Sequence, residues 1–131
     1  MQSVKVLIAT NVGLGTDLRA VLEPLSGPRL VGEIDPGSNL EILLQVEERE
    51  PNLLVLEFDG DRQPGICSHL LDQFPELTLL LLTEDGSDTR LLRRPVVGVD
   101  LNGNLENQLC TAIWQVERYL GMDDESHDLP S

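Results

Sequence analysis

The chain has 131 residues, with 9 lysine and arginine residues against 23 aspartate and glutamate residues, so its net charge is −14. This length predicts one domain that can hold a core without disulfides or a structural metal. The negative charge, without any block of basic residues, repels phosphate backbones and anionic lipids and therefore argues against nucleic acid and membranes as partners.

The N-terminal segment has neither the length of a membrane span nor the cleavage pattern of a signal peptide. The two cysteines, Cys67 and Cys110, are far apart in the sequence and lack the spacing of a metal site or a redox pair. This spacing favours two free thiols over a cystine. We therefore expect a cytoplasmic protein without a bound metal or cofactor.

Apolar runs of strand length alternate with helix-period segments, an order typical of βαβ units around a parallel sheet. The expected strands are residues 4–9, 29–34, 53–58, 77–82 and 96–101. The fourth run is apolar without alternation, as expected of a strand covered by helices on both faces. The predicted fold is α/β: a flavodoxin-like, doubly wound three-layer sandwich of five βα units with a five-stranded parallel sheet.

A segment with helical periodicity follows each expected strand. In chain order, the expected helices begin at about Thr16 and then cover residues 39–50, 65–74, 89–94 and 104–120. A turn at Gly13 and Gly15 precedes the first helix, which Thr16 caps. The fourth helix is short, because the segment around it is polar. Gly121 ends the last helix and leaves an acidic, flexible tail at residues 122–131.

In an open parallel sheet, ligands bind beyond the carboxyl ends of the strands. Polar side chains stand at or just after the ends of four expected strands. They are Thr10 and Asn11 after the first strand, Glu57 and Asp59 around the end of the third, Thr83 after the fourth and Asn102 after the fifth. We expect any functional pocket to lie at this edge.

From Lys5 to about Gly121, the sequence resembles the CheY-like receiver domains of two-component response regulators. The resemblance rests on the segments KVLI (5–8), GE (32–33), PNLLVLE (51–57), FPEL (74–77) and GVD (98–100), together with Thr83. In receivers, two acids after the first strand bind Mg²⁺, and an aspartate ending the third strand accepts the phosphoryl group. A threonine or serine ends the fourth strand, and a lysine ends the fifth.

Carried over residue by residue, the resemblance implies a degenerate site. Thr10 and Asn11 stand at the acidic pair, Glu57 at the phosphoacceptor, Thr83 at the switch hydroxyl and Asn102 or its neighbour at the lysine. No shift of alignment restores that lysine, because Lys5 is the only one in the chain and lies in the first strand. Phosphoryl transfer to a carboxylate needs a divalent cation and a fixed positive charge. We therefore expect that Glu57 is not phosphorylated.

The sequence leaves the role of Glu57 open. On one interpretation, its permanent charge holds the domain in an arrangement like that of a phosphorylated receiver. On the other, Glu57 is a solvated carboxylate without a switching role. A weak cation site that includes Glu57, Asp59 and Asp61 is a further alternative, because Mg²⁺ is bound through carboxylate oxygens.

The last helix carries an outward-facing tryptophan. The apolar face of this helix centres near Val116, and Trp114 lies about 150° away from it. An exposed tryptophan favours an interface. The corresponding helix of receivers commonly takes part in dimerisation and output contacts. The expected surface consists of Trp114, Cys110, Arg118, Arg90, Arg93 and Arg94. The alternative is a tryptophan covered by the acidic tail.

The leading functional prediction is an atypical receiver domain that acts as a signalling adaptor through protein–protein contact, independently of phosphorylation, and is not an enzyme. Its partner would be a signalling protein of unknown identity or a second copy of the chain. The alternative is a receiver-like sensor that binds a small ligand or cation at the carboxyl edge of the sheet. An enzyme of flavodoxin-like fold is disfavoured, since no nucleophile–base pair or phosphate loop is visible.

Overall fold

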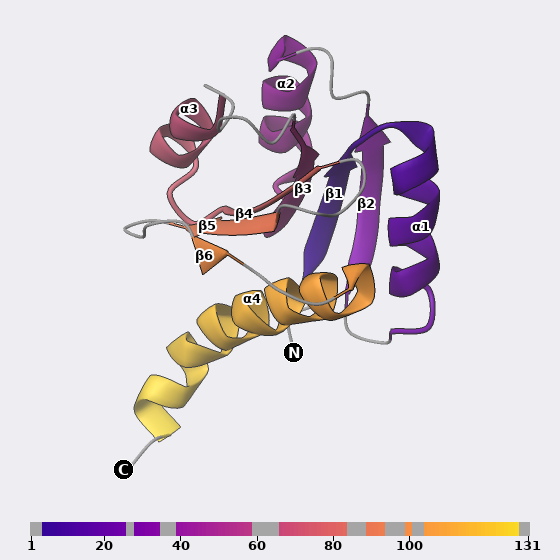
Figure 1. The fold of residues 1–131 in the computed structure, drawn as a ribbon. Coiled ribbons are helices and arrows are strands. Elements are labelled where there is room, and N and C mark those ends of the chain that lie inside the picture. The colour runs from indigo at the N-terminus through magenta and orange to yellow at the C-terminus, as the bar shows by residue number, and fades with distance from the viewer. Residues whose placement is uncertain are drawn as a thin grey trace.

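The computed structural model describes residues 4–25, 28–34, 39–58, 66–83, 89–93, 99–100 and 104–128. In chain order the elements are β1 (Lys5–Ala9), α1 (Val12–Leu22), β2 (Arg29–Ile34), α2 (Asn39–Arg49), β3 (Leu53–Glu57), α3 (Ile66–Gln73), β4 (Thr78–Leu82), β5 (Thr89–Arg93), β6 (Val99–Asp100) and α4 (Leu105–Asp128). Figure 1 shows a central sheet with helices on both faces.

The strands form one sheet in the order β2-β1-β3-β4-β5-β6. The first four of these strands are parallel. Strand β5 is antiparallel to β4, and β6 is antiparallel to β5. Strand β6 therefore runs in the same direction as β4 but is separated from it by β5. Helical crossovers between parallel strands confirm the doubly wound, flavodoxin-like α/β fold.

Two apolar cores lie on the two faces of the sheet, because successive residues of a strand point to opposite faces. Val55 of β3 packs in the core beneath α1 and α4, and its neighbour Leu54 packs in the core beneath α2 and α3. The sheet and its two helical layers therefore form a three-layer sandwich (Figure 1). Double coverage explains why the central strands lack polar alternation.

Helix α1 begins at Val12, four residues before the expected start. Its N-cap is Asn11, whose side-chain Oδ1 accepts a hydrogen bond of 2.9 Å from the backbone N–H of Leu14. Thr16, which we expected as the cap, lies inside the helix and donates from its hydroxyl to the carbonyl of Val12. The two glycines expected in a turn are helical. Asparagine is among the strongest N-caps, and here it sets the start despite the low helix propensity of glycine.

The short helix expected at residues 89–94 is wrong, because Thr89–Arg93 forms strand β5. Leu91 packs against the core beneath α1 and α4, while Leu92 belongs to the core beneath α2 and α3. Consecutive side chains of a strand point to opposite faces of the sheet, so a strand places these two leucines in opposite cores. Consecutive residues of a helix are not placed on opposite sides in this way. Because β5 occupies the edge of β4, the last strand pairs with β5, and the sheet has six strands where five were expected.

Helix α4 does not end at Gly121 but continues to Asp128. A glycine inside a helix costs about 1 kcal/mol relative to alanine, and it does not by itself end the helix. Figure 1 shows the last turns of α4 extending beyond the sheet. Within the described ranges, no helix is long and apolar enough to span a membrane.

Both cysteines are free, as expected. Cys67 of α3 is fully buried in the core beneath α2 and α3, and this burial raises the pKa of its thiol from 9.0 to about 12. Cys110 of α4 is half-buried. Burial, and to a lesser extent the charge of Glu106, raises the pKa of Cys110. Neither thiol is therefore an activated nucleophile.

Candidate functional site

Strands β1, β3 and β4 end side by side at the carboxyl edge of the sheet. Their register pairs Ala9 with Leu56, and Glu57 with Leu82. The predicted residues Thr10, Asn11, Glu57 and Thr83 therefore all stand at this edge. Asp59 and Asn102, which the sequence also assigned to the pocket, lie outside the described residues, as do Asp61 and Arg94.

Asn11 holds the carboxylate of Glu57 through two hydrogen bonds. The backbone N–H of Asn11 donates to Oε1 of Glu57 at 2.7 Å, and its side-chain Nδ2 donates to Oε2 at 3.0 Å. The same side chain accepts the capping hydrogen bond at the start of α1. One asparagine therefore joins the ends of β1 and β3 to the first turn of α1.

Asn11 and the amino end of α1 both present the positive ends of dipoles to the carboxylate of Glu57. Hydrogen bonds to a charged acceptor are stronger than those between neutral groups. The amino end of α1, where Glu57 is held, carries the positive end of the helix dipole. Asn11 and α1 together therefore offset the charge of Glu57 with backbone and amide dipoles.

A cation at Glu57 would have to compete with these hydrogen bonds. The amide nitrogen of Asn11 faces one carboxylate oxygen and its backbone nitrogen faces the other, and neither of these N–H donors is a ligand for Mg²⁺. In the described part of the chain, no group of three or more histidine, cysteine, aspartate or glutamate side chains is placed to hold a metal ion.

The two threonines of the predicted pocket are buried, each with only 8% of its surface exposed. Thr10 donates from its hydroxyl to the carbonyl of Asn11 at 3.1 Å. Helix α1 comes close to this threonine at Gly15, where an added Cβ would lie 3.3 Å from the hydroxyl of Thr10 and 3.1 Å from a carboxylate oxygen of Glu33. The corner between β1 and α1 is thus closely packed.

The exposed surface of α4 carries three of the predicted interface residues in one line. Cys110, Trp114 and Arg118 are four residues apart in turn, so they share a helix face. Trp114 is 51% exposed, and the guanidinium carbon of Arg118 lies 4.9 Å from the centroid of its ring. Residues 122–128 continue the helix instead of folding back over the tryptophan. We call these three residues the α4 stripe.

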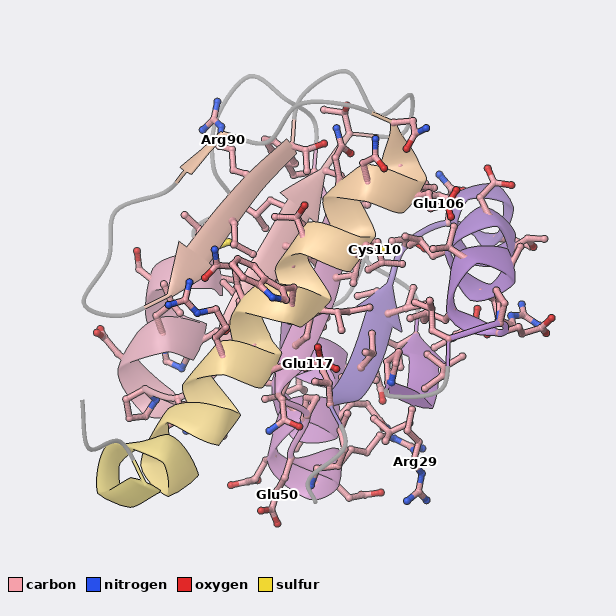
Figure 2. The ribbon with its side chains drawn as sticks, turned by 90° about the horizontal axis from the view of Figure 1, so that it is seen from below. Arg29, Glu50, Arg90, Glu106, Cys110 and Glu117 are labelled. Carbon is pink, nitrogen blue, oxygen red and sulfur yellow. The ribbon has the colours of Figure 1, made fainter. Side chains whose placement is uncertain are left out.

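Arg90 is not part of the α4 stripe. Its guanidinium carbon lies 5.6 Å from the ring centroid of Phe58, a buried residue of the core beneath α2 and α3. Figure 2 shows Arg90 on β5, apart from Cys110 on α4. The sheet therefore separates Arg90 from Trp114. The side chain of Arg93 lies outside the described part.

Sequence reasoning missed one buried polar pair that connects the sheet edge to α4. The hydroxyl of Thr89 donates to Oε1 of Gln108 at 2.9 Å, and each residue is only 3% exposed. Thr89 begins β5 at the carboxyl edge of the sheet, and Gln108 lies in the first turn of α4. Identifying residues 89–93 as a strand would have pointed to this contact, since alternation then places Thr89 and Leu91 on the face that α4 covers.

Of the comparisons with known proteins, the comparison with solved structures finds similar proteins and the comparisons of sequence do not. No family model matches the sequence, and no curated protein matches it. Among solved structures, the anti-anti-sigma factor PhyR of Bartonella quintana is similar, with a TM-score of 0.58, 16% identity, and coverage of 90% of this chain and 51% of that one.

Two further structures are response regulator proteins. The RcsB response regulator of Salmonella typhimurium matches with a TM-score of 0.51 and 20% identity over 63% of this chain and 44% of that one. The signal receiver domain of NarL from Mycobacterium tuberculosis matches with a TM-score of 0.51 and 18% identity, and the match covers 63% of this chain and 68% of that one. The matches span about half or less of PhyR and RcsB. The fold of this chain is that of a CheY-like response regulator receiver domain.

Proposed function

We propose that this protein is a receiver-like signalling adaptor that works without phosphorylation, through protein–protein contact. The observation that carries the proposal is the pair of hydrogen bonds from Asn11 to the carboxylate of Glu57. Because both oxygens at the phosphoacceptor position are engaged within the chain, the arrangement of this corner needs neither a metal ion nor a phosphoryl group. The likeness to receiver folds supports a signalling role.

The composition of the edge also argues against phosphoryl transfer. An attacking carboxylate oxygen has to be free, with a cation beside it to offset the charge of the phosphoryl group. Here an asparagine stands where receivers have an acid, and the sole lysine, Lys5, lies at the opposite end of β1. The charge stabilisation that the reaction requires is therefore missing from the residues described.

The α4 stripe is the proposed contact surface. Tryptophan and arginine are the residue types most enriched among the side chains that dominate binding at interfaces. The indole of Trp114 is half-exposed, and the guanidinium of Arg118 lies over its ring. A partner with an apolar pocket for the indole and a carboxylate beside it for the guanidinium fits this surface.

The test is a binding experiment with chelator-treated protein. Immobilised wild-type chain captures its partner from a native lysate containing EDTA, and the partner is identified by mass spectrometry and purified for titration. Trp114→Ala is expected to weaken the binding at least tenfold. The control variant is Leu40→Ala, which removes another exposed apolar side chain, on α2.

Three outcomes would overturn the proposal. One is binding that requires Mg²⁺ or acetyl phosphate, which would show a conventional phosphorylation switch. Another is equal binding by the wild type and Trp114→Ala, which would place the contact elsewhere. The third is equal weakening by Leu40→Ala and Trp114→Ala, which would indicate nonspecific apolar adhesion. Capture of a second copy of the chain, lost in Trp114→Ala alone, would support a homodimer as the adaptor.

A further inference from the structure

A cavity lies at the amino edge of the sheet, opposite the edge that carries Glu57. Its volume is about 350 Å³, near the lower end of the range for small-molecule pockets. It is lined where three strands begin, by Lys5 of β1, by Asn52 just before β3 and by Leu77 just before β4.

One part of the lining offers hydrogen-bond donors. The ammonium group of Lys5 has no ion pair within the described ranges. Asn52 uses its side-chain oxygen to accept from the backbone N–H of Lys5 at 2.8 Å, and its amide nitrogen carries two further N–H donors. Both residues line the same cavity, and an ammonium and an amide are groups suited to bind a carboxylate.

The remaining lining is apolar and acidic. Val46, Pro51 and Leu77 are buried, and Phe74 adds a partly buried aromatic ring. Glu50 and Glu76 bring negative charge to the same cavity. A simple anion meets these two carboxylates and the charge of −14 on the whole chain, whereas a ligand without net charge is not repelled.

The walls of the cavity are fixed by backbone hydrogen bonds. Asn52 donates from its backbone N–H to the carbonyl of Lys5 at 2.8 Å and accepts from the N–H of Thr78 at 3.0 Å. Glu50 follows the last residue of α2 and has φ of 49°, the left-handed conformation that commonly ends a helix. The end of α2 and the starts of β3 and β4 thus form the walls of the cavity.

We infer that this cavity binds a small zwitterion with an apolar side chain, the chemistry of an apolar α-amino acid. The carboxylate binds to Lys5 and Asn52, the ammonium faces the glutamates, and the side chain packs on Phe74. The cavity lies at the opposite end of the strands from the corner formed by Asn11 and Glu57, so this inference does not depend on the proposed adaptor role.

The test compares three probes that share a phenyl ring: L-phenylalanine, 3-phenylpropionate, which lacks the amine, and phenethylamine, which lacks the carboxylate. Each is titrated into the full chain at constant pH and ionic strength, and amide signals are followed by NMR. Because Lys5 is the only lysine, ¹³C labelling at lysine Cε gives one reporter signal inside the cavity. The control variant for Lys5→Met is Arg29→Met, which removes an equal charge from the neighbouring strand, at a residue paired with Lys5.

We expect saturable shifts at Asn52, Leu77 and the Lys5 Cε signal with L-phenylalanine, with a Kd on the order of 1 mM. The other two probes and the Lys5→Met variant are each expected to bind about fivefold more weakly or worse, while Arg29→Met stays within about twofold of wild type.

Three results would overturn the inference: no saturation by L-phenylalanine up to about 20 mM, equal affinity for all three probes, or unchanged binding in Lys5→Met. If Lys5→Met does not fold, the wild-type Lys5 Cε signal decides alone, because binding without any shift of that signal excludes the carboxylate contact.

Discussion

Asn11 donates two hydrogen bonds to Glu57 while its side-chain oxygen caps helix α1. The resemblance to receivers places these two residues at the metal-binding pair and the phosphoacceptor, and here an amide and a carboxylate join them directly. Under the proposed function, this contact takes the place of a phosphoryl group and a cation in organising the corner.

Removing the asparagine side chain tests the combined role of this residue. Asn11→Ala loses both the cap and the amide donor to Glu57, so we expect a loss of about 2–3 kcal/mol in the free energy of unfolding. The control is Asn104→Ala. Asn104 caps α4 through its Oδ1 at 2.8 Å from the N–H of Asn107, and no carboxylate among the described residues bonds to it, so this variant should lose only about 1 kcal/mol. Equal losses in urea unfolding would contradict the added role of Glu57.

Restoring an acid at this position should create repulsion. Asn11→Asp keeps a good capping side chain but places a carboxylate where an amide donates to Glu57. We expect a loss of about 1–3 kcal/mol at pH 7. This loss should shrink when Mg²⁺ is added, because a cation offsets the repulsion between the two carboxylates. Thermal unfolding of both proteins, with and without Mg²⁺, measures this effect. Stability equal to that of wild type at pH 7 would contradict the contact.

The buried hydrogen bond between Thr89 and Gln108 attaches β5 to α4. Thr89→Val preserves the shape of the side chain but leaves Oε1 of Gln108 without this donor, at an expected cost of about 1–2 kcal/mol. Thr16→Val is the matched control, since the hydroxyl of Thr16 donates to a backbone carbonyl at the exposed surface of α1. Its expected change is within about 0.5 kcal/mol. Comparable losses in the two variants would show that the buried bond contributes nothing special.

Cys67 should make the protein sensitive to alkali. Burial raises the pKa of its thiol from 9.0 to about 12, so the unfolded state loses this proton first as the pH rises. The stability contribution is complete below pH 9 and is lost between about pH 9 and 12, with a slope approaching about 1.4 kcal/mol per pH unit. Urea unfolding of wild type and Cys67→Ala at pH 8 to 10.5 isolates this contribution. Parallel pH profiles for the two proteins would contradict the burial of the thiol.

The first four strands and the polar residues at their carboxyl ends follow from patterns that the sequence carries locally. The unbroken apolar runs mark the doubly covered strands, and polar residues after them mark the carboxyl edge. The hydrogen bonds between Asn11 and Glu57 could not be predicted, because they depend on how far the extra methylene of Glu57 reaches toward β1.

Two of the departures from expectation, the strand at residues 89–93 and the position of Arg90, have tertiary causes. Leu91 and Leu92 are equally consistent with a short helix or a strand. The strand forms because the edge of β4 provides backbone hydrogen-bond partners for these residues. Arg90 was grouped with Trp114 on the assumption of a helix at this place. Once residues 89–93 are a strand, Arg90 shares a face with Leu92 and packs on Phe58 instead.

The most direct test of the central claim is an NMR titration of the wild-type chain with Mg²⁺ and beryllofluoride, a mimic of the phosphoryl group. If Asn11 keeps both oxygens of Glu57 engaged, the amide signals of Asn11, Glu57 and Thr83 stay where they are in EDTA, with Mg²⁺ alone and with both reagents. Saturable shifts of these three signals that require both reagents would show that the site takes a phosphoryl group after all, and the account of a phosphorylation-independent corner would be wrong.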